Sequence, residues 1–364
     1  RLYGAYFDLG FSFNDYLFVN ITGRNDWSST LPVNNQSYFY PGISTSFVFT
    51  DAFDMDNSIL SFGKLRGSYA QVGSDEAPYQ LDFLFSPEAD IFTQFVPNNT
   101  YPHGGQAAFV GPNVVPAGQN LQPQRQKTWE IGTELQFFKG RIGVDFTYYN
   151  TQTEDIIVTV ASAQSTGFEG VRRNAGITEN QGIEVLLSLQ PIRTNDLEWE
   201  IVANFTQNDQ TVKELAPGLE DLALTSGFSG LSIRAEEGEA FGLYGAGWER
   251  DPDGNIVINP TTGLRVPGDR TRLGDILPDW QLGIANRISY KNLTLTALVD
   301  ISQGGVMFSR TVSSLRGSGL AEETLENRGR IFIDQGVNEL PDPDDPNAVI
   351  YVNNETPVRS MQDF

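Results

Sequence analysis

Apolar and polar residues alternate along ten segments of this chain, and the segments come in pairs joined by short turns. The most regular segment places Trp129, Ile131, Thr133, Leu135 and Phe137 at every second position, between more polar neighbours. Side chains on a β-strand point to opposite faces with a period of two, so each segment has one apolar and one polar face. The pattern predicts an antiparallel all-β fold built from hairpins.

The ten segments form five hairpins whose connections alternate between short and long. The hairpins are expected at residues 3–24, 38–72, 127–153, 176–208 and 280–302. Most turns inside the hairpins are short, whereas the hairpins are separated by the polar stretches 25–37, 73–126, 154–175 and 209–279. The last of these stretches is expected to contain a small hairpin of its own, Phe241–Glu249 with Asn255–Asn259.

This alternation of connections is typical of a transmembrane antiparallel β-barrel with long extracellular loops. Outer-membrane barrels have short periplasmic turns and long extracellular loops, and loops of this length are uncommon in compact soluble domains. A closed sheet is also the only sheet that can span lipid, because every backbone polar group must be paired internally. The sequence has no run of about 20 apolar residues that would form a transmembrane helix. The layout favours transport rather than catalysis.

Composition excludes several other functions. The chain carries 46 acidic and 24 basic residues, a net charge of -22, which repels nucleic-acid phosphates. It has no cysteine and only one histidine, so Cys-type zinc sites and His-based triads lack their ligands and bases. We expect no cofactor and no nucleic-acid partner.

Two alternatives from other classes remain open at this point. A soluble all-β carbohydrate-binding protein or adhesin would bury its apolar strand faces between two stacked sheets. A secreted glycosidase would need a carboxyl pair such as Glu130 and Glu134, with one pKa raised by an apolar pocket. Alternation places both residues on the polar face of one strand, so we interpret them as lumen-facing carboxylates of a barrel.

Candidate functional residues fall into two groups. Lys64, Arg66, Glu130 and Glu134 are predicted to face the lumen, where the two cations would pair across strands with nearby acids. Four aromatic residues are expected outside the strands and are the candidates for substrate contact, because sugar rings and peptide side chains stack well on aromatic faces. They are Trp27, Tyr79, Tyr101 and Trp248. The competing interpretation is that these aromatics pack the loops against one another.

Two acidic segments raise the question of calcium. The stretch Asp251–Asn255 lacks the Gly and Glu spacing of an EF-hand and is better explained as a tight Asp-Gly turn. The carboxylates of Asp342, Asp344 and Asp345 could bind calcium weakly, but a solvated acidic loop is the favoured interpretation.

Several blocks of the sequence resemble a known family in collinear order. The stretches NITGRNDWSSTLP (Asn20–Pro32), YFYPGISTSFVFTDAF (Tyr38–Phe53) and KLRGSYAQVG (Lys64–Gly73) resemble TonB-dependent outer-membrane transporters of the SusC/RagA type. Residues 120–150, 174–192 and 274–305 continue the resemblance.

The resemblance implies that residues 1–364 are part of one 22-stranded barrel domain, with the plug, the N-terminal region and the last strands outside the chain. It also implies a non-enzymatic importer in the outer membrane of a Bacteroidetes-type bacterium. Such a transporter would take up an oligosaccharide or oligopeptide, using a SusD-like surface lipoprotein and energy supplied through TonB.

Overall fold

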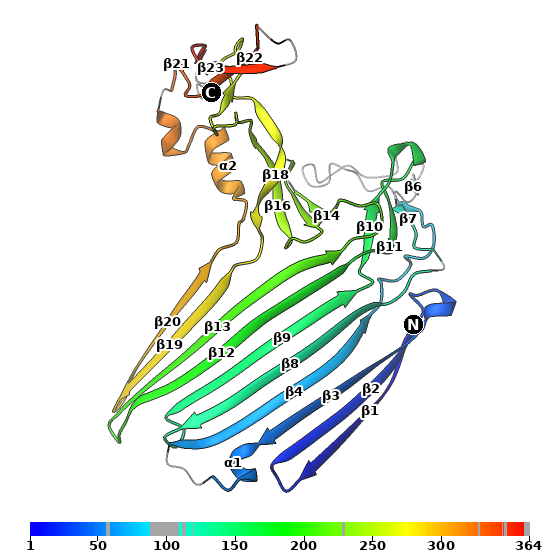
Figure 1. Ribbon diagram of the computed structural model, residues 1–364, viewed down its shortest axis with the longest axis vertical. Helices are drawn as coiled ribbons and strands as arrows, with labels where there is room; N and C mark the ends of the chain where they lie inside the picture. The colour runs from blue at the N-terminus through cyan, green and yellow to red at the C-terminus, as the bar shows by residue number, and fades with distance from the viewer. Residues whose placement is uncertain are drawn as a thin grey trace. The chain divides into compact units, whose positions relative to one another are not determined.

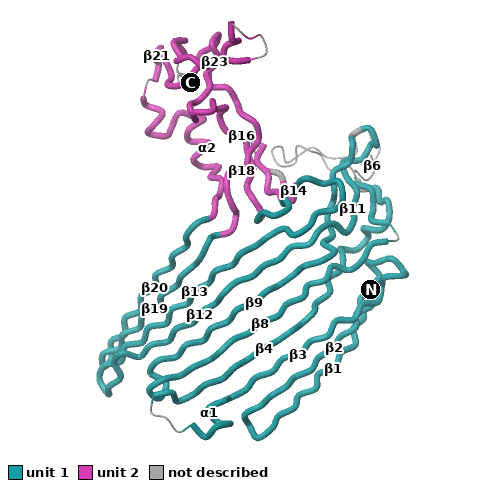
Figure 2. Tube along the Cα trace, in the orientation of Figure 1, with its two compact units in different colours: residues 1–222, 235–240, 278–304 teal, residues 223–234, 241–277, 305–364 magenta. Residues whose placement is uncertain are grey.

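The chain folds into two compact units (Figure 2). The computed structural model describes residues 1–55, 59–87, 109–110, 114–118, 120–227, 230–326, 328–343, 345 and 348–359. Unit 1 comprises residues 1–222, 235–240 and 278–304, and unit 2 comprises residues 223–234, 241–277 and 305–364. No helix among the described residues is long and apolar enough to cross a membrane.

A ten-stranded antiparallel sheet forms most of unit 1 (Figure 1). Its strands follow one another in chain order, β1-β2-β3-β4-β8-β9-β12-β13-β19-β20, so each strand pairs with its predecessor and its successor. The strands are β1 (Leu2–Phe13), β2 (Leu17–Ser28), β3 (Ser37–Val48), β4 (Leu60–Ser74), β8 (Gln124–Phe137), β9 (Ile142–Glu154), β12 (Ile177–Arg193), β13 (Leu197–Glu214), β19 (Trp280–Tyr290) and β20 (Leu293–Gln303). All five predicted hairpins are present.

The short turns adopt the backbone that tight hairpins need. Asn14 and Asp15 have φ values of 47° and 58°, and Lys139 has a φ of 58°. Turns with positive φ match the right-handed twist of the flanking strands. The second hairpin differs from the prediction, because β3 ends at Val48 and the next residues form the short helix α1 (Phe49–Ala52). The ring of Phe49 then lies against Gly63, where the absence of a Cβ leaves room for it.

The register of the sheet sorts side chains by polarity across all ten strands. One continuous row of paired residues contains nine apolar residues and one threonine: Phe13, Leu17, Phe47, Leu65, Thr133, Phe146, Val185, Phe205, Leu282 and Ile301. The adjacent row on the other face has one apolar residue: Ser12, Phe18, Ser46, Arg66, Gly132, Thr147, Glu184, Thr206, Gln281 and Ser302. The sheet therefore has an apolar face and a polar face.

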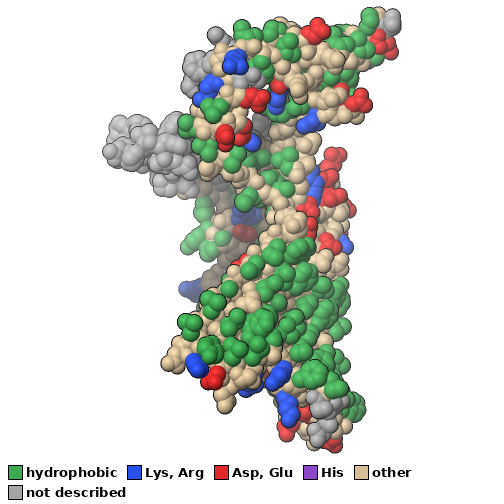
Figure 3. Space-filling model, turned by 90° about the vertical axis from the view of Figure 1, so that its left-hand side faces the viewer, with side chains coloured by type: hydrophobic (Ala, Val, Ile, Leu, Met, Phe, Trp, Pro, Cys, Tyr) green, Lys and Arg blue, Asp and Glu red, His purple; other side chains and the backbone are tan. Residues whose placement is uncertain are grey.

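Many side chains of the apolar face are open to the surroundings. Ile131 is 59% exposed, Leu65 50% and Leu295 63%. Viewed from the side of β19 and β20, hydrophobic side chains form a broad band over the sheet (Figure 3). Such a face is stable in hydrocarbon and costly in water. The stacked-sheet alternative required these side chains to be buried against a second sheet, and the described residues place none on them.

One irregularity interrupts the pairing near a short turn. The register of β12 shifts between Leu189 and Ile192, where three steps on β12 match the two steps from Ile201 to Trp199 on β13. This is a β-bulge, and it contains Pro191, which has no backbone N–H to donate to a neighbouring strand. After the bulge, Ile192 pairs with Trp199 and the apolar face continues.

Segments at the long-loop end of unit 1 form a small core. Leu31, Tyr38, Ala117 and Leu121 are buried together, and Leu121 comes from the segment before β8. The shorter elements of this end are η1 (Val33–Asn35), β5 (Ser86–Pro87), β6 (Phe109–Val110), β7 (Val114–Val115), β10 (Ile157–Ala161), η2 (Gln164–Thr166) and β11 (Gly170–Asn174). Loop residues therefore pack on one another and are not simply solvated.

Unit 2 is built largely from the long connection before β19 and from the residues after β20. Its residues contribute to small sheets of orders β14-β15-β16-β18, β17-β22-β23 and β21-β24, and the first two residues of β14 and the last two of β15 belong to unit 1. The elements are β14 (Asp221–Ser226), β15 (Ser232–Glu236), β16 (Gly242–Trp248), β17 (Val257–Ile258), β18 (Pro267–Asp275), α2 (Arg310–Gly317), η4 (Glu322–Leu325), β21 (Ile331–Ile333), β22 (Val337–Pro341), β23 (Val349–Asn353) and β24 (Pro357–Arg359).

The small hairpin predicted in this region is only partly correct. β16 pairs with β15 and β18, whereas β17 pairs in parallel with β22. The two predicted arms meet only near the turn, where the N–H of Val257 donates to the carbonyl of Glu249 at 2.9 Å and Arg250 bridges to Ile256. Local alternation indicated the strands correctly but could not identify their partners, which lie far along the sequence.

The two faces of the sheet predict opposite responses to one substitution. Phe205→Arg would place a charge on the apolar face and should destabilise the protein by about 2–4 kcal/mol in a bilayer. Asn204→Arg, at the adjacent position on the polar face, should cost about 0.5 kcal/mol or less. Denaturant unfolding from liposomes measures both. Equal losses for the two variants would contradict the assignment of the faces.

Candidate functional site on the polar face

The polar face brings four of the predicted residues onto neighbouring strands. Lys64 on β4 pairs in register with Glu134 on β8, and Ser68 pairs with Glu130. Arg66 lies between them on β4, opposite Gly132. Lys64, Arg66, Glu130 and Glu134 therefore share one side of the sheet.

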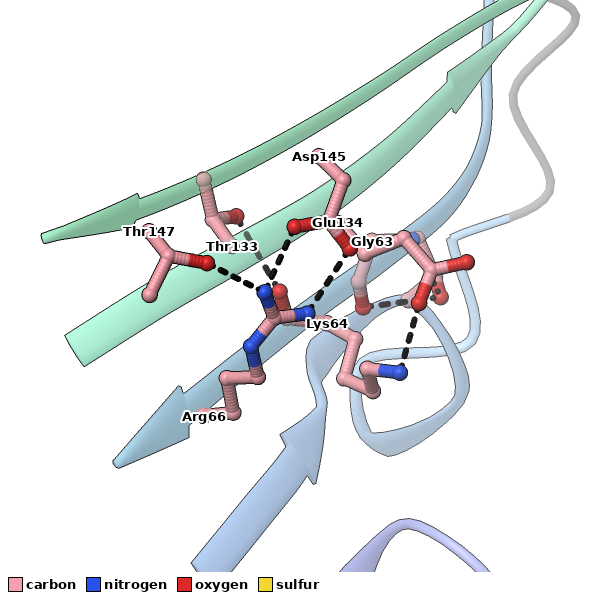
Figure 4. A network of polar contacts seen from close by, with 8 residues as sticks. Gly63, Lys64, Arg66, Thr133, Glu134, Asp145 and Thr147 are labelled. Carbon is pink, nitrogen blue, oxygen red and sulfur yellow. Dashed lines mark hydrogen bonds and ion pairs between the residues drawn. The ribbon is translucent and has the colours of Figure 1, made fainter. Parts of the chain in front are cut away.

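Arg66 reaches across β8 to bind residues of β9 (Figure 4). Its Nη1 and Nη2 donate to the two carboxylate oxygens of Asp145 at 2.8 and 2.5 Å, and Nη2 also donates to Oγ1 of Thr147 at 2.5 Å. A bidentate guanidinium–carboxylate pair fixes orientation as well as distance. The two side chains are 34% and 30% exposed, so solvent screens part of the attraction.

Gly132 makes this long reach possible. A Cβ at Gly132 would lie 2.7 Å from Nε of Arg66 and 2.8 Å from the backbone carbonyl oxygen of Phe146. Any larger residue there would push the guanidinium away from Asp145. A cation opposite a glycine, with an acid one strand further on, is the sequence signal that would have predicted this pair.

Two lysines of the sheet, Lys64 on the polar face and Lys127 near the long-loop end of β8, are also paired with acids of neighbouring strands. Lys64 Nζ lies 2.5 Å from Glu134 Oε2, in a directly opposed cross-strand pair. Oγ1 of Thr133 donates to the backbone carbonyl of Lys64 at 3.0 Å. Lys127 Nζ lies 2.6 Å from Glu154 Oε1. Such half-exposed pairs each contribute little stability, but they fix the strands' side chains in one arrangement.

Glu130 stands apart from this network. It lines a hollow of about 620 Å³ together with Arg66 and small side chains from β1, β2, β3 and β4. These small residues include Gly10, Ser12, Asn20, Ser44, Ser46 and Ser68. The Glu130 carboxylate forms no hydrogen bond or salt bridge with the described residues. The hollow thus offers hydroxyls, an amide, the Arg66 guanidinium and the Glu130 carboxylate to a polar ligand.

A second polar cluster lies at the long-loop end of the same unit. The buried Asp26 accepts hydrogen bonds from Arg24 Nε at 2.8 Å and from the Tyr40 hydroxyl. Nearby, the hydroxyls of Ser28 and Thr30 both donate to Asp75, the latter at 2.8 Å. Asp75 follows β4, so this cluster ties a long connection to β2.

Trp27 is not the loop residue that the sequence predicted. It lies in β2, where it pairs with Tyr3 on one side and Ser37 on the other. Strand β2 extends to Ser28 because both neighbours provide backbone partners that far. Position 27 belongs to the apolar face, and its indole is 42% exposed. Aromatic residues at the end of such a face belong to the membrane interface.

The other three aromatic candidates lie in different settings. Tyr79 is 76% exposed in the connection after β4, with a φ of 67°. Tyr101 falls outside the described residues. Trp248 is the last residue of β16, and the Arg265 guanidinium lies 5.9 Å from its ring centroid. None of these observations assigns a ligand to them.

Arg265 connects Trp248 to an acid of the same unit. Its Nε and Nη2 donate to the carboxylate of Asp334 at 2.6 and 3.0 Å. Hydrogen bonding to Arg265 lowers the pKa of Asp334 below its usual value. The pair holds a cation over an aromatic face, an arrangement that stabilises both groups.

The carboxylate of Asp251 is hydrogen-bonded to the backbone of its own turn. The Asp251 carboxylate accepts hydrogen bonds from the backbone N–H of Asp253 at 3.0 Å and of Asn255 at 2.7 Å. The Asn255 side chain donates to it at 2.9 Å, which lowers the pKa of Asp251. Asp344 lies outside the described residues, and the described part contains no group of three or more acids or histidines arranged for a metal.

A long antiparallel meander with an apolar face, a polar face and short turns at one end is the wall of an outer-membrane β-barrel. The family model for the TonB dependent receptor-like beta-barrel matches residues 1–318, so the chain belongs to that family. The resemblance inferred from the sequence blocks and the outer-membrane location are thereby confirmed. The family comprises receptors and transporters, which agrees with the prediction that the chain is not an enzyme.

Curated relatives share the sequence over much of the chain. TonB-dependent receptor P3 of Formosa agariphila is 26% identical over 338 residues, covering 85% of this chain and 32% of the relative. TonB-dependent receptor SusC of Bacteroides thetaiotaomicron is 28% identical over 209 residues, covering 56% of this chain and 20% of SusC. The chain thus spans about a third or less of these relatives.

Solved structures share the fold. The RagAB peptide transporter matches with a TM-score of 0.65 and 21% identity, covering 82% of this chain and 33% of that one. The outer membrane transporter YddB from Escherichia coli matches with a TM-score of 0.51 and 13% identity, covering 85% of this chain and 34% of that one.

Gly132 supplies a matched pair of alanine substitutions. Gly132→Ala should destabilise the protein by about 1–3 kcal/mol, because the new methyl group would clash with a backbone carbonyl and with Arg66. Gly67→Ala should change stability by about 0.5 kcal/mol or less, since its Cβ would meet only ordinary contacts at 3.7 and 4.0 Å. Unfolding in lipid measures both variants. If the Gly132→Ala protein were as stable as the Gly67→Ala protein, the Arg66 side chain would not depend on the space above Gly132.

Asp334 should make unit 2 sensitive to acid. Because its folded pKa is below the unfolded value of about 3.9, its contribution to stability is complete above that pH and is lost as the pH falls through the folded pKa. The hydrogen-exchange protection factors of residues 241–277, which correct for the intrinsic pH dependence of amide exchange, should therefore fall between about pH 5 and pH 2. Asp334→Asn should exchange faster at neutral pH and show less of this acid dependence. An unchanged profile would contradict a stabilising role for the pair.

Proposed function

We propose that the protein containing this chain is an active nutrient importer of the outer membrane. It would take up an oligosaccharide or an oligopeptide with energy delivered through TonB. The observation that supports this most strongly is the match of residues 1–318 to the TonB-dependent receptor barrel, on a sheet whose polar face lines a hollow. This face offers hydrogen-bonding groups without a nucleophile and base arranged for covalent chemistry.

The polar face suits a cargo rich in hydroxyl or amide groups. Serine and asparagine side chains around the hollow can exchange hydrogen bonds with either class of ligand. The carboxylate of Glu130, which forms no hydrogen bond or salt bridge with the described residues, and the net charge of -22 favour neutral or cationic cargo. RagAB, whose structural likeness shows the fold alone, is described as a peptide transporter.

A SusD-like surface lipoprotein is the proposed partner, as the family resemblance implies. Exposed apolar side chains in unit 2 support a protein contact, because large exposed apolar patches commonly mark interaction sites. Met307 is 91% exposed, Leu320 75%, Ile331 69% and Leu325 62%. A partner that covered these side chains would remove apolar surface from water.

Uptake assays test the import function directly. Cells lacking the receptor should fail to accumulate one class of labelled oligomer, and the intact gene should restore accumulation. A protonophore, or loss of the SusD-like lipoprotein, should lower uptake by the complemented cells. Normal growth and uptake by the deletion strain on both an oligosaccharide panel and an oligopeptide panel would refute the proposal.

Glu130 should influence cargo charge. Glu130→Gln is expected to reduce uptake of a cationic oligopeptide about fivefold relative to its neutral analogue, because a carboxylate contributes about 1 kcal/mol to such a contact. The matched control is Glu184→Gln, which removes the same charge from the polar face but not from the hollow. Equal effects of the two substitutions would mean that the hollow does not contact cargo.

A further inference from the structure

A second hollow, of about 590 Å³, lies at the short-turn end of the sheet between two hairpins. Ile142 and Leu189, which are opposed across β9 and β12 on the apolar face, form part of its lining. Phe138 and Pro191 add further apolar surface. The β-bulge at Pro191 interrupts the strand pairing at this point, which gives the hollow its place on an otherwise continuous wall.

Two cations line the same hollow. Lys139 and Arg141 come from the turn between β8 and β9, and Gln190 is the only other polar residue of the lining. Neither cation forms a salt bridge or a side-chain hydrogen bond with the described residues. This differs from the polar face, where Lys64 and Arg66 each bind a carboxylate. In a chain with a net charge of -22, these two exposed cations have no carboxylate partner among the described residues and are available to an external anion.

The location of these residues defines what can approach them. The apolar face contacts acyl chains, and the short turns lie where that face meets the headgroups. Lysine and arginine at such a boundary extend their charged ends toward headgroups while their aliphatic stems remain on apolar surface. A ligand that fits must therefore carry a negative group above a long apolar tail.

We propose that this hollow binds one anionic glycerophospholipid of the membrane leaflet at the short-turn end. The headgroup phosphate would contact Lys139 and Arg141, and one acyl chain would occupy the hollow against Ile142, Leu189 and Pro191. Gln190 would donate a hydrogen bond to the headgroup or its ester oxygens. The inference depends on the outer-membrane location and not on import or on the identity of the cargo.

Lipid retention by the purified receptor tests the proposal. The receptor is extracted in mild detergent, exchanged with phosphatidylglycerol or phosphatidylethanolamine, and analysed by native mass spectrometry. Lys139→Gln/Arg141→Gln should bind phosphatidylglycerol about 25-fold more weakly, since each cation near an anionic headgroup contributes a roughly fivefold effect. Its much weaker binding of the zwitterionic phosphatidylethanolamine should be unchanged.

Matched variants separate this site from general effects of charge and folding. Lys291→Gln/Arg287→Gln removes the same charge from another hairpin near the same end of the sheet and should retain phosphatidylglycerol normally. Pro191→Phe keeps both cations but fills the hollow, and it should also lose the lipid. Heat-modifiable migration in electrophoresis establishes that each variant is folded.

Three results with the variants would overturn the proposal. They are equal retention by the Lys139/Arg141 variant and the wild type, equal loss in the Lys291/Arg287 control, and full retention by the filled Pro191→Phe hollow. Competition by inorganic phosphate gives a fourth test. If millimolar phosphate displaced phosphatidylglycerol completely, the site would be a phosphate site without an acyl-chain component, and the lipid assignment would be wrong.

Discussion

Backbone hydrogen bonding in a medium without water is the constraint on which the rest of this structure depends. Within hydrocarbon, each N–H and C=O must find a partner in the protein, and an antiparallel sheet provides one on both sides of each inner strand. Once the strands are paired, the period of two dictates that every second side chain meets lipid. The row from Phe13 to Ile301 and its polar neighbour from Ser12 to Ser302 follow from this single rule. A one-residue slip of any strand would expose its polar side chains to lipid.

The polar face shows how a surface rich in charge is organised without a buried core. Lys64 and Arg66 bind carboxylates of other strands, and such a pair can span an intervening strand where a glycine leaves room. Arg66 passes over Gly132 to Asp145 in this way, which locks β4, β8 and β9 together through side chains as well as backbone. Glu130 is left outside the network, and its carboxylate is the acidic group that lines the hollow.

Much of the wall could be predicted from the sequence, because alternation and turn residues act over short distances. The hairpin at residues 280–302 could be predicted from the alternation and from the turn residues alone. In the structure the turn residue Lys291 has a φ of 51°. What could not be predicted depended on partners far along the chain. Trp27 was assigned to a loop because nothing local shows that β1 and β3 extend β2 to Ser28. The partner of β17 was missed because β22 lies about 80 residues later.

The candidate site follows the same division. The alternation of polar and apolar residues correctly predicted that Lys64, Arg66, Glu130 and Glu134 share one face. The partner of Arg66 could not be predicted, because it depends on the space above Gly132. The aromatic candidates rested on composition alone, and composition does not fix where a side chain lies.

The chain-order pairing of the ten strands has an evolutionary consequence. Since no strand crosses over another, a long connection such as the one between β13 and β19 can lengthen, shorten or be replaced while the hydrogen-bond ladder on either side keeps its alignment. Recognition segments can diversify rapidly above a wall that stays nearly constant. A bacterial lineage that meets a new food source could then change which cargo its receptor captures while the membrane-spanning wall stays the same.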